Sequence, residues 1–324
     1  MQKVAGIDIS KDTLAVCLSA EAKIQEFEVP NEKAGFEQLF KASGTDALYL
    51  MEATGAYYLR LACFLHERGC RVAVVNPLCI KRFIQLHLGK SKTDRKDAQW
   101  LMRYGQHETV KDWQPDAPWL QQARQLEQSI ELLTKQRTMF LNSLEALTLH
   151  PTCCKTALQC QQKVLKSVER NLTRLEEELQ TLLETVHARE LELLTSIPGI
   201  GKKTAAALIL FASGFTQLDN YRQLIAMAGL CPREFSSGSS IRGKSRITKM
   251  GGGAMRSRLY MCSFAAKRFN GACKALYDRL RDKGKPVKVA LIAVCNKLLK
   301  QAFAIVKSGL AYRENFAENQ LVFS

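Results

Sequence analysis

The order of secondary-structure signals in the first third of the chain restricts the fold more than any other feature. Three apolar segments, Val4–Ile9, Leu14–Ser19 and Ile24–Val29, follow one another with short turns and predict an antiparallel meander. Two further apolar strands, at Ala47–Met51 and Arg71–Val75, alternate with helical segments. This order predicts an α/β domain whose first and fourth strands lie side by side.

Four acidic residues occupy positions in this domain where a carboxylate is costly or has another carboxylate nearby. Asp8 lies inside the first apolar strand, and Glu52 directly follows the fourth. Asp94 and Asp97 are three residues apart at the start of a helix that Thr93 can cap, so one helical turn places both on the same face. Each acid taken singly is also compatible with a hydrogen-bonded or helix-capping role.

Acids held together repel each other unless something positive lies between them. The local candidates are four cationic side chains, Lys90, Lys92, Arg95 and Lys96. The other candidate is a divalent metal. The strand order is that of a ribonuclease-H-like fold, which would bring the four acids together, and two magnesium ions about 3.5–4 Å apart would satisfy them and drive phosphoryl chemistry.

The net charge of +16 is concentrated at one end of the chain. Residues 196–324 contain 22 of the 47 Lys and Arg residues but only 6 of the 31 acidic ones, so this segment accounts for the whole excess. A solvated surface does not need such an excess of basic residues, whereas binding to a polyanion explains it. Nucleic acid is the polyanionic partner that we expect. A basic membrane-binding face is less well supported, because the sequence lacks a long amphipathic basic helix.

Composition also bears on the cellular compartment. No apolar run approaches the roughly 18 residues that span a bilayer, and the first ten residues do not resemble a signal segment. The eleven cysteines lack paired CxxC spacing, which is typical of free thiols in a reducing compartment. We therefore expect a cytoplasmic protein with no membrane partner.

The middle of the chain predicts helices with no chemical role of their own. Residues 113–119 contain two prolines and are expected to form a linker. Two runs then place mostly apolar residues at alternating steps of three and four: Leu126, Ile130, Leu133, Arg137, Phe140, Leu144 and Leu147, and Leu165, Val168, Leu172, Leu175, Leu179, Leu182 and Val186. This spacing predicts a coiled-coil spacer, formed either as an antiparallel hairpin or between molecules.

The segment from Ser196 to Ala205 has the pattern of a helix-hairpin-helix. Gly199 and Gly201 allow a tight turn, after which the free N–H groups of the next helix can bind a phosphate beside Lys202 and Lys203. Such a motif binds the nucleic-acid backbone without sequence preference. The alternative is an ordinary glycine-rich connection between helices.

Residues 233–249 are rich in serine, glycine and basic residues. A serine nucleophile for phosphoryl transfer needs small neighbours and nearby cations. The cations are Arg242, Lys244, Arg246 and Lys249. No histidine lies near, which excludes a Ser-His pair within this segment, and a flexible basic loop is the alternative.

Several motifs together resemble the "one-ten" insertion-sequence family of DEDD transposases, relatives of the Piv-type DNA invertases. They are Gly6-Ile7-Asp8, Met51–Gly55, Val75-Asn76-Pro77, Lys92–Ala98, Ala228–Leu230, residues 237–243 and Arg256–Tyr260. The resemblance implies a RuvC-like amino-terminal domain in which Asp8, Glu52, Asp94 and Asp97 bind magnesium.

The same resemblance places Ser237 at the position of a nucleophile that forms a covalent phosphoserine with DNA, with Ser236 as the alternative. It also implies a structured guide RNA (a bridge RNA). A further implication is a homo-oligomer, dimer or tetramer, in which one protomer's acids act with another's serine. Arg256 and Arg258 in the last matching motif are further candidates for nucleic-acid binding.

We therefore predict three parts: a RuvC-like DEDD domain at 1–112, a linker with coiled-coil helices at 113–190, and a mostly helical basic transposase domain at 191–324. The predicted function is that of an insertion-sequence transposase acting on donor and target DNA. The alternatives are a metal-dependent junction endonuclease without a covalent intermediate and a non-catalytic nucleic-acid-binding scaffold.

Overall fold

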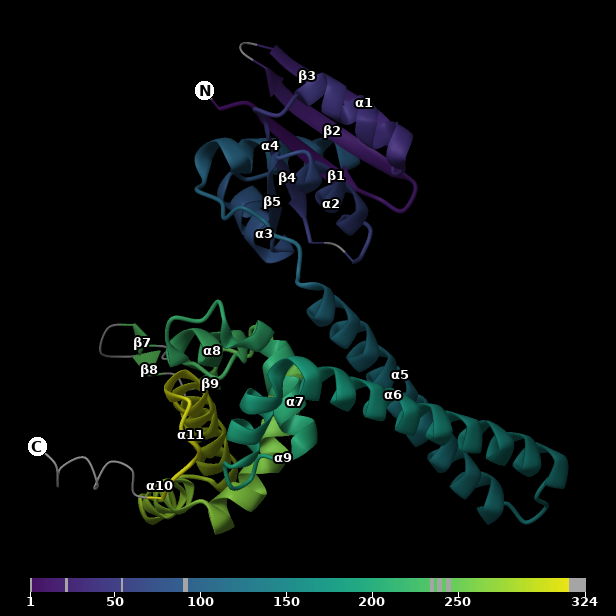
Figure 1. The fold of residues 1–324 in the computed structure, drawn as a ribbon, viewed down its shortest axis with the longest axis vertical. Coiled ribbons are helices and arrows are strands. Elements are labelled where there is room, and N and C mark those ends of the chain that lie inside the picture. The colour runs from purple at the N-terminus through teal and green to yellow at the C-terminus, as the bar shows by residue number, and fades with distance from the viewer. Residues whose placement is uncertain are drawn as a thin grey trace, which may run out of the picture. The chain divides into compact units, whose positions relative to one another are not determined.

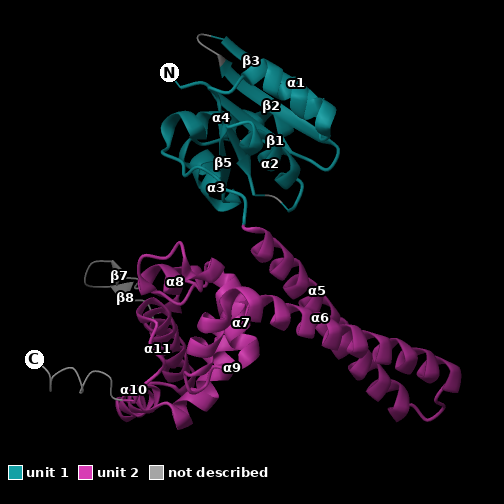
Figure 2. Cartoon of the chain, in the orientation of Figure 1, with its two compact units in different colours: residues 1–116 teal, residues 117–324 magenta. Residues whose placement is uncertain are grey.

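The computed structural model describes residues 2–20, 23–53, 55–89, 93–233, 236–237, 241–242 and 246–314. It divides into two compact units, residues 1–116 and 117–324 (Figure 2). The predicted helical spacer is assigned to the second unit rather than forming a unit of its own, because the carboxyl-terminal part of its second helix packs into that unit's core, as Leu183, Leu191 and Leu194 show.

Unit 1 is built on one mixed sheet (Figure 1). Its strands are β1 Val4–Ile9, β2 Thr13–Ala20, β3 Lys23–Pro30, β4 Leu48–Glu52 and β5 Arg71–Val75. They lie in the order β3-β2-β1-β4-β5. Strands β1, β2 and β3 pair antiparallel, whereas β4 pairs parallel with both β1 and β5. The predicted meander and the predicted neighbourhood of the first and fourth strands are both confirmed.

Helices cover both faces of this sheet, and the alternation of side chains along each strand decides which face a residue joins. Helices α1 Lys33–Ser43 and α2 Leu59–Glu67 pack with Ile7 and Met51 on one face. Helices α3 Pro77–Leu86 and α4 Asp94–His107 pack on the other, where Val4 and Leu50 contribute to the core. Even-numbered residues of β1 and β4 therefore face α4.

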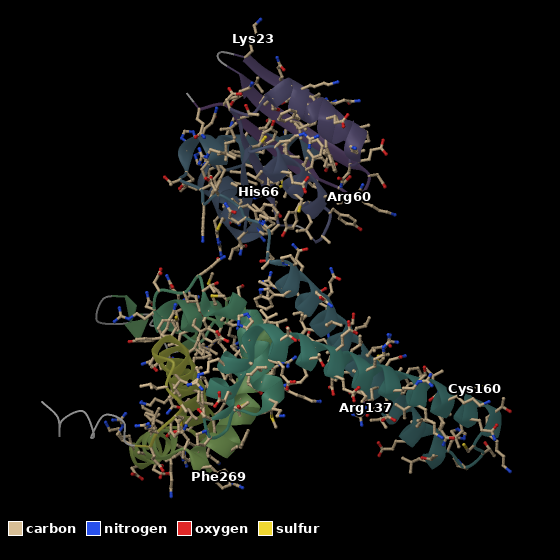
Figure 3. All side chains as sticks on the ribbon, viewed as in Figure 1. Lys23, Arg60, His66, Arg137, Cys160 and Phe269 are labelled. Carbon is tan, nitrogen blue, oxygen red and sulfur yellow. The ribbon has the colours of Figure 1, made fainter. Side chains whose placement is uncertain are left out.

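The middle of the chain forms two long helices, α5 Pro118–Leu149 and α6 Lys155–Thr195, which pack against each other as a hairpin (Figure 1). His150 and Pro151 follow the end of α5, as predicted. Arg137, the polar member of the first apolar run, is labelled on this hairpin in Figure 3. Its Nε donates to Oε1 of Glu169 on α6 at 3.1 Å. Pairing of these helices with a second molecule stays a prediction.

The rest of unit 2 is helical around one core. It contains α7 Lys202–Phe211, a short 3-10 turn η1 Ser213–Phe215, α8 Tyr221–Met227, α9 Gly253–Phe269, α10 Gly271–Asp282 and α11 Val287–Ser308. Helix α11 is the single helix among the described residues that is long and apolar enough to cross a membrane. Eight of its residues are buried in the core of unit 2, which accounts for its apolar face without a membrane.

Candidate active site

The parallel pairing of β1 with β4 brings two of the predicted acids level with each other. The register pairs Gly6 with Leu50 and Ile7 with Met51. One step further along the same register, Asp8 stands beside Glu52, both at the carboxyl ends of their strands. Both are even-numbered, so they belong to the face that α4 covers, and both are half-buried.

Gly6 sets how closely α4 approaches these strands. A Cβ built on Gly6 would overlap the backbone N of Met102 and the backbone O of Ala98. Only hydrogen therefore fits between β1 and α4 at this point. Farther along the helix, a Cβ on Gly105 would lie 2.8 Å from Cγ1 of Val4, so the close contact is repeated.

The first turn of α4 carries the other two acids. Thr93 has extended backbone angles, and its Oγ1 accepts a hydrogen bond from the N–H of Lys96 at 3.3 Å, which confirms it as the N-cap. Asp94 and Asp97 follow in the first turn, the former exposed and the latter half-buried. Of the local cations, Lys90 and Lys92 lie outside the described residues.

The electrostatics show that the other three acids act on Asp8. The pKa of Asp8 is raised from its ordinary 3.8 to about 6, first by burial and then by the negative charges of Asp97, Asp94 and Glu52, in that order. A hydrogen bond from the backbone of Ile9 opposes this shift. We call these four residues the acid cluster.

The chemistry of the acid cluster fits a hard divalent cation, because carboxylate oxygens are the ligands that Mg²⁺ prefers and a cation would relieve the repulsion at Asp8. Within the part of the chain that the structure describes, however, no three His, Cys, Asp or Glu side chains are close enough to hold a metal ion. Glu52 on β4 and Asp94 and Asp97 on α4 thus lie near enough to Asp8 to raise its pKa, without forming a closed set of ligands with it. Their role as metal ligands stays a prediction.

The predicted helix-hairpin-helix lies between α6 and α7, which pack against each other. Gly199 has a φ of +104°, and a Cβ there would lie 2.8 Å from the Cβ of Ala266 on α9. Gly201 precedes α7 as its N-cap, with open space around it. Lys202 is exposed, and the Nζ of the exposed Lys203 contacts Oε1 of Glu176 on α6 at 2.6 Å.

The serine-rich segment forms two pairs of very short antiparallel strands. Strand β6 Pro232–Arg233 pairs with β9 Arg246–Ile247, and β7 Ser236–Ser237 pairs with β8 Ile241–Arg242. We call this the serine hairpin. In its register, the backbone of Ser237 stands opposite Ile241 and that of Ser236 opposite Arg242.

The predicted cations of this segment are only partly described. Arg246 and Lys249 are exposed, and Lys249 has a left-handed backbone with a φ of 55°. Lys244 lies outside the described residues, and of Arg242 only the backbone is described.

Two predicted nucleic-acid contacts are held by partners within the chain. Arg256 donates from Nη1 to the backbone O of Ala228 at 2.9 Å and also to that of Gly251. Arg258 pairs with Glu127 at 3.2 Å and with Glu131 at 3.5 Å, both on α5. Burial raises the pKa of Glu127, whereas Arg258 lowers it, so this pair joins α9 to α5. In this structure both arginines stabilise the fold, and their binding to nucleic acid stays a prediction.

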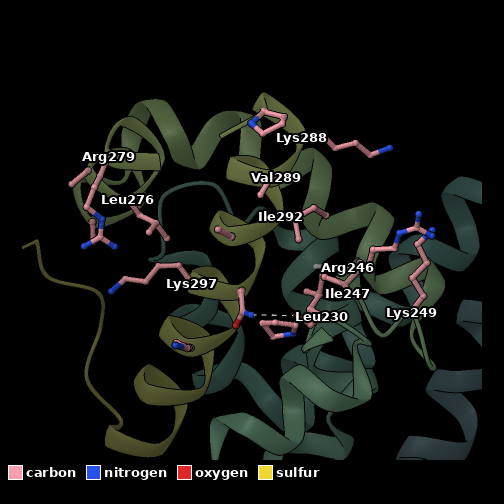
Figure 4. Close-up of a pocket in the computed structure, with 17 residues that line it drawn as sticks. Leu230, Arg246, Ile247, Lys249, Leu276, Arg279, Lys288, Val289, Ile292 and Lys297 are labelled. Carbon is pink, nitrogen blue, oxygen red and sulfur yellow. Dashed lines mark hydrogen bonds between the residues drawn. The ribbon is translucent and has the colours of Figure 1, made fainter. Parts of the chain in front are cut away.

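Unit 2 contains a basic cavity that the sequence did not predict (Figure 4). It lies between the base of the serine hairpin and helices α10 and α11. Four of its cations were not singled out beforehand: Arg279, Lys288, Lys297 and Lys300. The excess of basic residues in the last third of the chain was the one sequence feature that pointed to this cavity. It shows how many cations are present but not which of them lie together in the fold.

Comparisons with known proteins agree with these features. A family model for DEDD transposases of the IS110 type, described as "Transposase", matches residues 5–151, and another, described as "Transposase IS116/IS110/IS902 family", matches residues 191–278. The pilin gene-inverting protein of Moraxella bovis is 30% identical over 327 residues, which cover 97% of this chain and 98% of that protein.

Two further relatives are insertion-element proteins. An uncharacterised 43.6 kDa protein of IS110 from Streptomyces coelicolor is 32% identical over 149 residues, 46% of this chain and 36% of that protein. The transposase of IS1111A from Coxiella burnetii is 25% identical over 352 residues, 96% of this chain and 91% of that protein. The chain therefore belongs to the IS110 family of transposases, enzymes of DNA transposition and recombination.

Proposed function

We propose that this chain cuts and rejoins the DNA of an insertion sequence through a covalent phosphoserine at Ser237, with a divalent metal, magnesium, at the acid cluster. The observation that carries the proposal is the placement of the acids: the parallel pairing of β1 with β4 sets Glu52 level with Asp8, and the first turn of α4 carries Asp94 and Asp97. The charges of these three acids add to the effect of burial in raising the pKa of Asp8. Acids grouped in this way are typical of metal-assisted phosphoryl transfer.

The reaction follows from these groups. The Oγ of Ser237 bonds to the scissile phosphorus as the bond from phosphorus to the departing deoxyribose oxygen breaks. The hydroxyl proton of serine is lost to water, and the departing oxygen leaves as a hydroxyl. A second DNA hydroxyl then attacks the same phosphorus and releases the serine. Bound magnesium would stabilise the negative charge on the phosphate oxygens.

The proposal has four finer parts. The strand order β3-β2-β1-β4-β5, with helices on both faces, supports a RuvC-like assignment for unit 1. We further propose a homo-oligomer, a structured guide RNA and a cytoplasmic location. The relatives' names include a gene-inverting protein and a transposase, so inversion and transposition are both products to look for.

The test uses the full-length chain, plasmid DNA containing the element's own ends, and RNA transcribed from the flanking non-coding region. An end-labelled strand should become attached to protein only with Mg²⁺ present, and mass spectrometry should map the attachment to Ser237. Ser237→Ala should abolish the adduct, whereas Ser240→Ala, a matched control in the same segment, should retain it. An adduct at Ser236 would move the nucleophile by one residue.

The acid cluster is tested in the same assay. Asp94→Asn with Asp97→Asn should abolish cutting, while Asp12→Asn, an exposed acid between β1 and β2, should not. DNA cut normally by the Ser237→Ala variant would favour the junction endonuclease. Unchanged activity of the Asp94/Asp97 double variant would favour the non-catalytic scaffold.

A further inference from the structure

The basic cavity in unit 2 has the dimensions of a ligand site. Its volume is about 1090 Å³, near the upper end of the roughly 300–1,000 Å³ usual for ligand pockets. The walls come from three places: the base of the serine hairpin at Pro232 and Ile247, helix α10 at Leu276, and helix α11 at Val289 and Ile292 (Figure 4). These side chains give the cavity an apolar floor.

Cations surround this floor. Six line the cavity: Arg246, Lys249, Arg279, Lys288, Lys297 and Lys300. Among the described residues, none that lines the cavity is acidic, and none of the six cations takes part in an ion pair. So many like charges around one cavity repel one another, and an anionic occupant would relieve that repulsion.

One polar group in the wall lacks a partner. Asn296 donates from Nδ2 to the backbone O of Leu230 at 3.4 Å, but its Oδ1 is buried and accepts no hydrogen bond within the described residues. A buried acceptor left without a donor costs about 1–3 kcal/mol, so a turn of the Asn296 amide that brings Oδ1 to an N–H of an occupant is favoured here. Every nucleic-acid base has such a donor on its pairing edge.

We propose that this cavity binds one unpaired nucleotide of the DNA substrate, with the base on the apolar floor near Asn296 and the flanking phosphates on the surrounding cations. A paired base inside a duplex cannot reach the floor, because its faces and pairing edge are already covered, so the nucleotide must be outside the helix. This inference rests on the proposed function and adds a site for the DNA strand to it.

Two rival occupants match the cavity less well. Among the described lining residues, Asn296 is the single uncharged polar side chain, and the base already uses its oxygen, so no side-chain acceptor is left for the proton of a ribose 2′-hydroxyl. The chain's own last ten residues, 315–324, contain one acidic side chain, Glu318, which does not balance six cations. DNA is therefore the occupant to which we commit.

The position of the cavity suits such a role. Pro232 in its wall is five residues from Ser237, which limits the separation of their Cα atoms to about 18 Å. A nucleotide held in the cavity would keep the strand next to the serine hairpin while the neighbouring phosphate reacts. We expect the cavity to take a nucleotide that flanks the scissile position.

The test measures binding without chemistry, using the full-length chain in EDTA and a labelled DNA duplex with one bulged 5-iodo-deoxyuridine. The bulged duplex should bind about tenfold more tightly than the fully paired duplex or one with an abasic bulge. On irradiation, the cross-link should map to residues 230–300. An equal affinity for all three duplexes, or a cross-link elsewhere, would overturn the proposal, as would stronger binding of a bulged RNA duplex.

Variants separate the parts of the site. Lys288→Gln with Lys297→Gln, both on α11, should reduce the steepness of log affinity against log salt by about 1.4 and weaken the bulge preference. The control pair Lys274→Gln with Lys307→Gln, one on α10 and one on α11 but both outside the cavity, should reduce both by less. Asn296→Leu should remove the preference for the bulge without weakening binding to paired DNA. Val289→Trp, at a half-exposed position of the apolar lining, should narrow the cavity and lower the bulge preference, which provides a second test if Asn296→Leu does not fold.

The two proposals fail separately. If wild-type protein forms no DNA adduct with Mg²⁺ but still prefers the bulge in EDTA, the phosphoserine mechanism is wrong and the cavity site stands. If the adduct forms but the variants bind the bulge normally, the cavity site is wrong and the mechanism stands. A bulge preference that appears only when residues 315–324 are deleted would show that the chain's own end occupies the cavity and would overturn the DNA assignment.

Discussion

Removing the charge of Asp8 should stabilise unit 1 of the metal-free protein at neutral pH. The side chain is half-buried among three other acids, and its pKa is about 6 instead of 3.8. A difference of this size corresponds to about 3 kcal/mol of unfavourable free energy when Asp8 is ionised. Because the group keeps some contact with solvent, we expect a measured gain of about 2 kcal/mol for Asp8→Asn at pH 7.5.

The sign of the pH dependence follows from the direction of the shift. Between pH 3.8 and 6 the folded state binds more protons at Asp8 than the unfolded state does, so stability falls as the pH rises. The unfavourable free energy of the ionised Asp8 is absent below pH 3.8 and fully present above about pH 6. The gain from Asp8→Asn should therefore be near zero at pH 4 and level off above pH 6.5. The asparagine Oδ1 can still accept the hydrogen bond from Ile9.

The assay is urea denaturation in EDTA from pH 4 to 8, followed by tryptophan fluorescence. A Trp119→Phe background leaves Trp100 and Trp113 as reporters, both in unit 1. Asp12→Asn, an exposed acid in the same unit, is the matched control and should change little. Adding Mg²⁺ should stabilise the wild type more than the variant. The free energy of unfolding of the wild type should fall relative to that of Asp8→Asn between pH 4 and 6. If it does not, the repulsion between Asp8 and the other acids is refuted.

Three further predictions concern unit 2 and can be checked by thermal or chemical denaturation and by filter binding. Gly199→Ala should destabilise the protein by about 1–3 kcal/mol, because of its positive φ and the nearby Ala266, whereas Gly201→Ala should have little effect in open space. Arg258→Leu should cost about 1–3 kcal/mol by leaving Glu127 without its cation, and equal stability would show that the pair contributes nothing. Lys202→Gln should weaken binding to all duplex sequences alike, and a loss confined to one sequence would contradict a phosphate contact.

The sequence was sufficient for those features that local patterns determine. Alternating apolar residues and short turns predicted the five strands of unit 1 and the pairing of the first with the fourth. The Thr93 cap followed from residue type and spacing alone. The acid cluster could be predicted because strand ends and a helix start are positions that a fold brings together in a regular way.

Features made by tertiary packing could not be predicted in this way. The cavity takes side chains from the serine hairpin, α10 and α11, and no spacing along the chain links Arg246 to Lys300. The ion pairs of Arg258 could not be predicted, because its partners lie more than a hundred residues away on α5. Two-residue strands such as β7 show no alternation, so the serine-rich segment was indistinguishable from a loop.

The contact of Gly6 with α4 has a consequence for reading variation in this family. Gly6 has no functional group, yet a larger residue there would displace the first turn of α4, and with it Asp94 and Asp97, away from Asp8. If the acid cluster acts as proposed, such a change abolishes the reaction although it removes no chemical group. If active relatives always have glycine at this position, the reason is that no side chain fits there. A search for catalytic residues by their chemical groups would overlook such a position.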